Sequence, residues 1–211
     1  MKQIETEHLS FSYPGGNSAL RDVTLSVEPG EFVTLCGLSG CGKSTLLRLL
    51  KPGIQPRGEV GGRILLNGRE LPAQPDSRTA AAVGFVMQDP EAQTVTDKVW
   101  HELAFSCESV GLPRGEIRRR VGEMACYFGL EELFGRDTST LSGGQKQLLC
   151  LASAAALHPE ILLLDEPASQ LDPVAAQNFV DAVRRLNHDF GITVIAAEHR
   201  LEELLPISDR V

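Results

Sequence analysis

Apolar residues along the chain follow two patterns that predict two kinds of strand. In segments 4–13 and 20–27, apolar positions alternate with polar ones, which is typical of strands with one buried face. Four other runs are apolar almost throughout, which is typical of parallel strands covered on both faces: residues 32–36, 83–87, 161–164 and 193–197. The sequence therefore predicts an antiparallel β layer beside a buried parallel sheet.

From about residue 96 to residue 128 the pattern becomes helical, and Gly129 is expected to end that stretch. Its apolar face consists of Ile117, Val121, Met124, Ala125 and Phe128. Three further helices are expected: one directly after Thr45, one that ends at about His158, and one over residues 173–187. Because the helical residues separate two buried strands, we expect one α/β domain over 1–211 in which they form an inserted subdomain rather than a separate fold.

A glycine-rich segment joins the strand at 32–36 to the helix that follows it. Such a segment lets several backbone N–H groups converge on an anion at a helix N-terminus, and Lys43 adds a positive charge for the β- and γ-phosphates. The pattern predicts a phosphate-binding P-loop rather than an ordinary glycine turn, with Ser44 placed to ligate Mg²⁺. The residues expected to bind the nucleotide here are Gly37, Ser39, Gly40, Cys41, Gly42, Lys43, Ser44 and Thr45.

Composition narrows the possible partners and compartments. The formal net charge of −8 argues against a nucleic-acid partner, which requires a basic surface. Five cysteines without a C-x-x-C spacing indicate neither a disulfide framework nor a zinc site, and they fit a reducing cytosol. The sequence has no apolar signal core at its N-terminus and no apolar run of membrane-spanning length, so any membrane role is expected to be peripheral.

The order of the polar motifs resembles that of the ATP-binding cassette (ABC) ATPases over nearly all 211 residues. The distinguishing segment is the signature sequence Leu141, Ser142, Gly143, Gly144 and Gln145, which precedes a buried strand that ends in Asp165 and Glu166. The resemblance implies an α/β P-loop NTPase fold with a RecA-like core, an antiparallel β subdomain and an inserted helical subdomain at about 90–158. It also implies that Tyr13 stacks on the adenine base, although an edge-strand aromatic is the alternative.

The same resemblance supplies roles for the polar residues that follow the buried strands. Asp165 would hold Mg²⁺ together with Ser44 and Gln88, and Glu166 would activate the attacking water as general base. His199 would contact the γ-phosphate. The catalytic set is therefore expected to comprise Glu166, His199, Gln88 and Lys43.

The resemblance also implies that two such domains associate head to tail. The residues support this, because the signature offers a second anion site and one triphosphate hardly needs two such sites from one chain. Ser142 can also act simply as the N-cap of its own helix, and both roles are compatible. Asp172 resembles the loop residue that couples the two sites. Family members continue beyond the position of Val211, so the chain is expected to be the first half of a tandem ATPase or a C-terminally truncated domain.

Segments 88–93 and 198–203 look like those of the energy-coupling-factor ATPases, which drive uptake of vitamins or of cobalt and nickel ions. The expected partners are transmembrane transporter subunits and a second ABC ATPase domain, with no nucleic acid. The expected location is cytoplasmic and peripheral on the inner face of the cell membrane, and the expected ligands are ATP and Mg²⁺. Two alternatives remain, a soluble ABC ATPase with a non-transport partner and a regulatory subunit that senses nucleotide.

Overall fold

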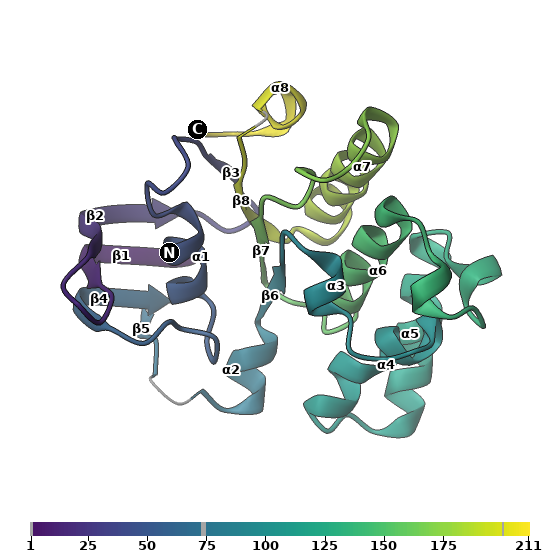
Figure 1. Ribbon diagram of the computed structural model, residues 1–211. Coiled ribbons are helices and arrows are strands. Elements are labelled where there is room, and N and C mark those ends of the chain that lie inside the picture. Colours follow the sequence, from purple (N-terminus) through teal and green to yellow (C-terminus); the bar gives the residue numbers. More distant parts are fainter. Residues whose placement is uncertain (1, 73–74, 200) are drawn as a thin grey trace.

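Two four-stranded sheets form the framework of the chain, one with strand order β2-β1-β4-β5 and one with order β3-β8-β7-β6 (Figure 1). The computed structural model describes residues 2–72, 75–199 and 201–211. The antiparallel sheet contains β1 (Ile4–Ser12), β2 (Ser18–Val27), β4 (Glu59–Leu66) and β5 (Arg69–Glu70). The parallel sheet contains β3 (Phe32–Leu35), β6 (Val83–Val86), β7 (Ile161–Asp165) and β8 (Thr193–Ala197). Both predicted sheets are confirmed.

Helices cover both faces of the parallel sheet. The longer ones are α1 (Lys43–Leu50), α4 (Val99–Ser109), α5 (Arg114–Tyr127), α6 (Gly143–Ala155) and α7 (Pro173–Phe190). The shorter ones are α2 (Ser77–Ala81), α3 (Pro90–Gln93) and α8 (Leu201–Leu204), with single 3₁₀ turns at Glu131–Leu133, Thr138–Thr140 and Leu205–Ile207. In Figure 1, α1 lies on the side of the antiparallel sheet, and α3 to α6 lie on the opposite side. Within the described ranges, no helix is both long and apolar enough to cross a membrane.

Side chains of β7 alternate between two hydrophobic cores. Ile161 and Leu163 pack in the core that α1 shares with the antiparallel sheet. Leu162 and Leu164 pack in the core formed with the helical residues of α4 to α7. Since successive side chains of a strand point to opposite faces, an uninterrupted apolar run is what a strand between two cores requires.

The predicted helical stretch 96–128 is divided into two helices. Helix α4 ends at Ser109 and α5 begins at Arg114, and between them Gly111 adopts a φ of 77°. Pro113 precedes the first residue of α5, where its missing N–H costs no intrahelical hydrogen bond. The predicted apolar face is confirmed, because Val121, Met124, Ala125 and Phe128 are buried and Ile117 is partly buried against the same core.

The carboxyl ends of all four parallel strands meet at one edge of the sheet. Strand β8 lies between β3 and β7, with Ala197 in register with both Leu35 and Asp165, and β6 completes the sheet beside β7. The segments that leave these ends are the phosphate loop after β3, the Gln88 segment after β6, Glu166 after β7 and His199 after β8. Segments far apart in the sequence therefore share one edge, as expected for a ligand site in an open α/β sheet.

Candidate active site

The phosphate loop between β3 and α1 is shaped by its glycines. Gly40 and Gly42 adopt φ values of 80° and 101°, in the left-handed region that residues with a Cβ rarely occupy. A Cβ on Gly42 would lie 2.6 Å from the backbone oxygen of Ala19 in β2, so the loop packs too closely on that strand for any other residue. Lys43 is buried, and its Nζ donates to the backbone oxygen of Gly37 over 2.9 Å. The lysine ammonium therefore lies inside the curve of its own loop.

A cavity of about 420 Å³ lies beside this loop, within the usual size of a small-molecule pocket. It is lined by Tyr13, Ala19, Ser39, Gly40, Gly42, Lys43, Ser44, Thr45, Gln88 and Glu166. Most of these residues were predicted from the sequence to bind nucleotide or Mg²⁺. No signature residue is among the described residues that line this cavity.

Oxygen atoms suited to Mg²⁺ come together at the start of α1. The Ser44 hydroxyl donates to Oδ1 of Asp165 over 2.6 Å, and Asp165 is only 4% exposed at the end of β7. Gln88 adds an amide to the wall of the same cavity. Hydroxyl, carboxylate and amide oxygens are the donors that Mg²⁺ prefers, so these three residues fit the predicted metal site. Arg48 lies nearby, with Nη2 3.9 Å from Oδ2 of Asp165.

Glu166 and His199 form a contact pair at the mouth of the loop. Nε2 of His199 lies 2.8 Å from Oε1 of Glu166 and 3.4 Å from Nζ of Lys43. The Gln88 side chain donates to the second oxygen of Glu166, Oε2, over 3.3 Å. The structure thus brings all four predicted catalytic residues into one cluster, which is the arrangement that in-line attack on a terminal phosphate needs.

Tyr13 lies between the phosphate cavity and a neighbouring cavity of about 330 Å³ formed by residues 12–16, Gly58 and Glu59. Its hydroxyl is 3.0 Å from Oγ1 of Thr45, and its ring forms a T-shaped pair with Phe11, with centroids 4.9 Å apart. A flat aromatic surface beside the phosphate loop suits a nucleobase, so base stacking stays a prediction supported by position.

The signature residues begin α6, away from the cavity lining. The Ser142 hydroxyl accepts the N–H of Gln145, and the Gln145 side chain accepts the N–H of Ser142, which is a complete capping box. Within the described residues, the N–H groups of Gly143 and Gly144 have no hydrogen-bond partner, so they are free for an anion. The predicted N-cap role of Ser142 is therefore confirmed, and its role in a second domain stays a prediction. Leu141, the first residue of the signature, is buried.

Asp172 is the N-cap of α7, because its Oδ1 accepts the N–H groups of Val174 and Ala175 over 3.0 Å each. Helix α7 begins close to the signature, since a Cβ on Gly144 would lie only 2.8 Å from the Cβ of Ala175. The structure thus places Asp172 beside the signature helix and gives it a capping role. The coupling role between two domains stays a prediction.

Sequence reasoning missed residues that hold the Gln88 segment. Met87 is held on both sides, since its N–H donates to Gln93 over 2.7 Å and its oxygen accepts from Nε2 of Gln147 in α6 over 3.0 Å. Ser169 also lies 3.3 Å from the Gln88 amide. Gln147 is completely buried, and the sequence offered a signal in a polar residue on the buried face of α6.

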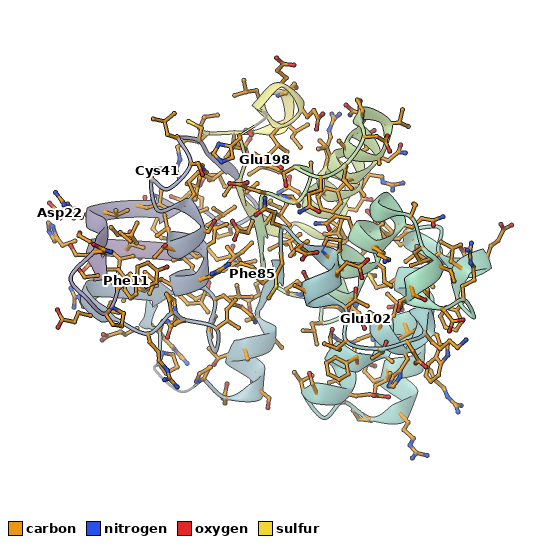
Figure 2. All side chains as sticks on the ribbon, in the orientation of Figure 1. Phe11, Asp22, Cys41, Phe85, Glu102 and Glu198 are labelled. Carbon is orange, nitrogen blue, oxygen red and sulfur yellow. The ribbon has the colours of Figure 1, made fainter. Side chains whose placement is uncertain are left out.

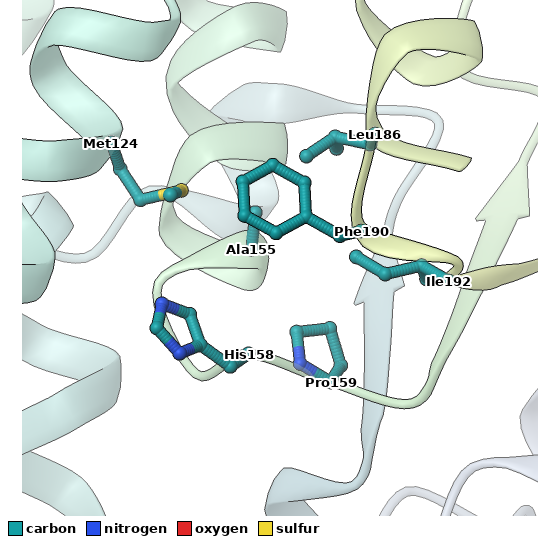
Figure 3. A pocket seen from close by; sticks show the side chains of 7 residues that line it. All are labelled: Met124, Ala155, His158, Pro159, Leu186, Phe190 and Ile192. Atoms are coloured by element: carbon teal, nitrogen blue, oxygen red, sulfur yellow. The ribbon is translucent and has the colours of Figure 1, made fainter. Parts of the chain in front are cut away.

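A smaller cavity of about 150 Å³ lies between the helical subdomain and the C-terminal end of α7 (Figure 3). Its walls are mostly apolar, with His158 as the polar exception: Met124, Ala155, His158, Pro159, Leu186, Phe190 and Ile192. Burial lowers the pKa of His158 below its ordinary value. None of the predicted site residues lines this cavity.

The fold and the site define a P-loop nucleotide-binding domain with an inserted helical subdomain. Comparison with protein families matches residues 20–169 to the family described as ABC transporter. The chain belongs to the ABC transporter family and forms an ATP-binding cassette ATPase domain. This finding confirms the predicted fold class and the family resemblance.

Named relatives agree with this assignment. The chain is 45% identical over 208 residues to an ABC transporter ATP-binding protein of Bacillus cereus, covering 98% of this chain and 38% of the relative. It is 43% identical over 212 residues to an ABC transporter ATP-binding protein of Methanosarcina acetivorans, covering 99% of this chain and 33% of the relative. The chain thus spans about a third of the length of these relatives.

Solved structures show the same fold. One is CbiO1 of Clostridium perfringens, described as part of the ABC transporter complex CbiONQ, with a TM-score of 0.88 and 29% sequence identity. The match covers 99% of this chain and 82% of the CbiO1 chain. A dimeric ATP-binding cassette in a post-hydrolysis state with ADP and Pi has a TM-score of 0.80 at 24% identity, covering 95% of this chain and 89% of its own. The second likeness supports the fold alone.

We expect alkylation of Cys41 to abolish ATP binding, because the thiol is exposed inside the phosphate loop. Mg-ATP should protect Cys41, and mass spectrometry of labelled peptides measures the rate with and without nucleotide. Cys126 is a control within the same chain, since it is also exposed and its pKa is raised by a hydrogen bond to Glu131. Burial raises the pKa of Cys150 to about 12, so that residue should stay unlabelled.

Because Cys36 is also exposed at the start of the loop, it is first replaced by serine in this experiment. Equal labelling of Cys41 with and without saturating Mg-ATP would contradict the placement of the triphosphate in this loop.

Proposed function

We propose that this domain hydrolyses ATP and that the hydrolysis powers a membrane transporter of the energy-coupling-factor type, which imports a vitamin or a metal ion. The observation that carries the proposal is the meeting of Lys43, Glu166 and His199 at the carboxyl edge of the parallel sheet. Membership of the ABC transporter family supports a transport role. The resemblance of segments 88–93 and 198–203 to the energy-coupling-factor ATPases supports the finer assignment.

In the proposed reaction, the phosphate loop binds the triphosphate and Glu166 accepts a proton from the attacking water. Lys43 turns its ammonium from the oxygen of Gly37 to the β- and γ-phosphates, and His199, whose Nε2 lies 3.4 Å from that ammonium, contacts the γ-phosphate. Ser44 and Asp165 would hold Mg²⁺, which supplies positive charge for the developing phosphate charge. Gln88 reaches Glu166 and Ser169, and it would detect whether this cluster is assembled.

A second ATPase domain, from the same or another polypeptide, would complete the site from outside. Support for this step comes from Ser142, Gly143 and Gly144, whose free donors lie outside the phosphate cavity of their own domain. Helix N-termini attract anions, so these donors would bind the terminal phosphate held by the partner domain.

The proposed membrane partner docks on the segment 88–105, and the domain would then lie at the cytoplasmic face of the membrane. Exposed apolar side chains are present there, with Val95 at 61% exposure and both Trp100 and Phe105 at 43%. Such side chains suit the apolar surface of a partner helix. The similarity to CbiO1, which is part of a transporter complex, supports a partner of this kind.

Crosslinking from Val95→Cys should capture a membrane protein, because Val95 is exposed beside the Gln88 segment. The variant is made after the exposed Cys36, Cys41 and Cys126 have been replaced by serine, and products from membrane-containing extracts are identified by mass spectrometry. Val60→Cys on β4 is the matched control, since Val60 is 54% exposed on the antiparallel sheet.

If Val95→Cys yields only soluble partners, the alternative of a soluble ABC ATPase replaces the transport proposal. Equal capture of the membrane protein by both cysteine positions would show that the docking surface is not the segment 88–105. The identity of the captured protein also indicates the transported substrate, because the membrane-embedded partner selects it in this class of transporter.

A further inference from the structure

Glu198 links the two chemically active turns of the site. It directly follows β8, is only 2% exposed, and lies on the same side of the molecule as Cys41 (Figure 2). Its Oε1 accepts the N–H of Ala168 over 3.0 Å, and its Oε2 accepts the N–H of His199 over 3.0 Å. One buried carboxyl group therefore joins the turn after β7 to the residue after β8.

The turn that Glu198 holds contains Glu166 in a strained conformation. Glu166 has a φ of 48°, in the left-handed region that a residue with a long side chain rarely adopts. Such strain persists where surrounding contacts hold it, and it is concentrated at active sites. Here the N–H of Glu166 donates to the oxygen of Ala197 over 2.9 Å, and the hydroxyl of Ser169 donates to the oxygen of Glu166 over 2.8 Å. Glu198 supplies the contact to Ala168 between them.

These backbone contacts lie close to a pair of side chains in contact. Glu166 and His199 lie 2.8 Å apart, and the backbone of each is tied within two residues to the Glu198 carboxyl group. Because small displacements of catalytic groups reduce rates strongly, a fixed link of this kind affects the chemical step. Glu198 is absent from the lining of the phosphate cavity, so its effect is indirect.

We propose that Glu198 is a positioning residue that sets the placement of the Glu166 carboxylate relative to the His199 imidazole. The inference rests on the proposed ATPase function and on Glu166 as its general base. Glu198→Gln keeps the size of the side chain, but its NH₂ group cannot accept a backbone N–H. We expect kcat for ATP hydrolysis to fall about 10- to 100-fold, while the affinity for ATP stays unchanged.

The experiment compares kcat and KM of Glu198→Gln with those of Glu202→Gln, whose exposed carboxyl group lies four residues further along. Hydrogen exchange of the amides of Ala168 and His199 is measured on the same proteins and should accelerate only in Glu198→Gln. The double variant with Glu166→Gln should hydrolyse ATP no more slowly than Glu166→Gln alone, because positioning a base has no value once the base is absent. A merely structural role would instead reduce the activity of both backgrounds by the same factor.

The possible outcomes separate this inference from the proposed function. If Glu166→Gln retains full hydrolysis, the proposed mechanism fails. If Glu166→Gln loses hydrolysis and Glu198→Gln keeps its kcat, only the positioning role is overturned. Multiplicative losses in the double variant, or a loss of ATP affinity equal to the loss of kcat, also overturn it. Should Glu198→Gln fail to fold, Glu198→Asp provides the same measurements, since its shorter side chain cannot reach both N–H groups.

Discussion

Glu166→Gln should bind ATP normally and hydrolyse it about 10²- to 10⁴-fold more slowly than the native domain, the usual contribution of a general base. The amide keeps the shape of the side chain and an oxygen that can accept a hydrogen bond, but it cannot accept the proton of the attacking water. The contacts to His199 at 2.8 Å and to Gln88 at 3.3 Å suit this nearly isosteric change. The measurement is phosphate release together with equilibrium binding of a fluorescent ATP analogue.

Lys43→Ala is the matched control, because it removes the ammonium from the phosphate loop and should abolish ATP binding and hydrolysis together. A variant that no longer binds ATP has lost the function of the phosphate loop. A variant that binds ATP but does not hydrolyse it has lost the general base. Undiminished hydrolysis in Glu166→Gln would exclude Glu166 from the catalytic role. Absence of hydrolysis in the native domain with its partners would favour the nucleotide-sensing alternative.

The second large effect concerns association of two domains. In the Glu166→Gln background, ATP should produce a stable dimer that ADP does not produce, because the γ-phosphate would be shared by Lys43 of one domain and Ser142 of the other. Ser142 is exposed at the start of α6, so an arginine there would enter the shared site. Ser142→Arg should therefore bind ATP and remain monomeric, as measured by light scattering.

The control for Ser142→Arg is Ser142→Ala, which removes the helix cap without adding bulk. Loss of an N-cap costs about 1 kcal/mol, so both variants should show a similar decrease in thermal stability. Only the arginine variant should block dimerisation completely. A dimer that persists in Ser142→Arg would contradict the shared site.

Much of this architecture could be predicted from the sequence, because apolar periodicity and the phosphate loop are local signals. The uninterrupted run of β7 predicted a strand between two layers, and the structure places Leu162 and Leu163 in different cores. The location of the site at the carboxyl edge of the parallel sheet could also be predicted, because parallel strands present their carboxyl ends together. Lys43 and His199 could therefore be expected near each other, although 156 positions separate them.

Other features depend on tertiary contacts that no local pattern encodes. The sequence did not indicate that the stretch 96–128 is divided, although Gly111 and Pro113 mark the division once the turn is known. The contact of Glu198 with Ala168 needs the neighbouring strands β7 and β8 in register, and the hydrogen bond from Gln147 to Met87 needs α6 packed against β6. Buried polar residues of this kind appear in the sequence only as polar interruptions of apolar runs. Their hydrogen-bond partners cannot be identified from the sequence.

The hold of Gln147 on Met87 has a mechanical consequence in the proposed dimer. Helix α6 starts at the signature, which would contact one ATP. One turn later, Gln147 of the same helix donates a hydrogen bond to Met87, and Met87 precedes Gln88 at the site of the other ATP. A shift of α6 along its axis would therefore pull on that strand end. In the proposed dimer, α6 would then couple the two nucleotide sites mechanically, and loss of nucleotide from one site would alter the geometry of the other.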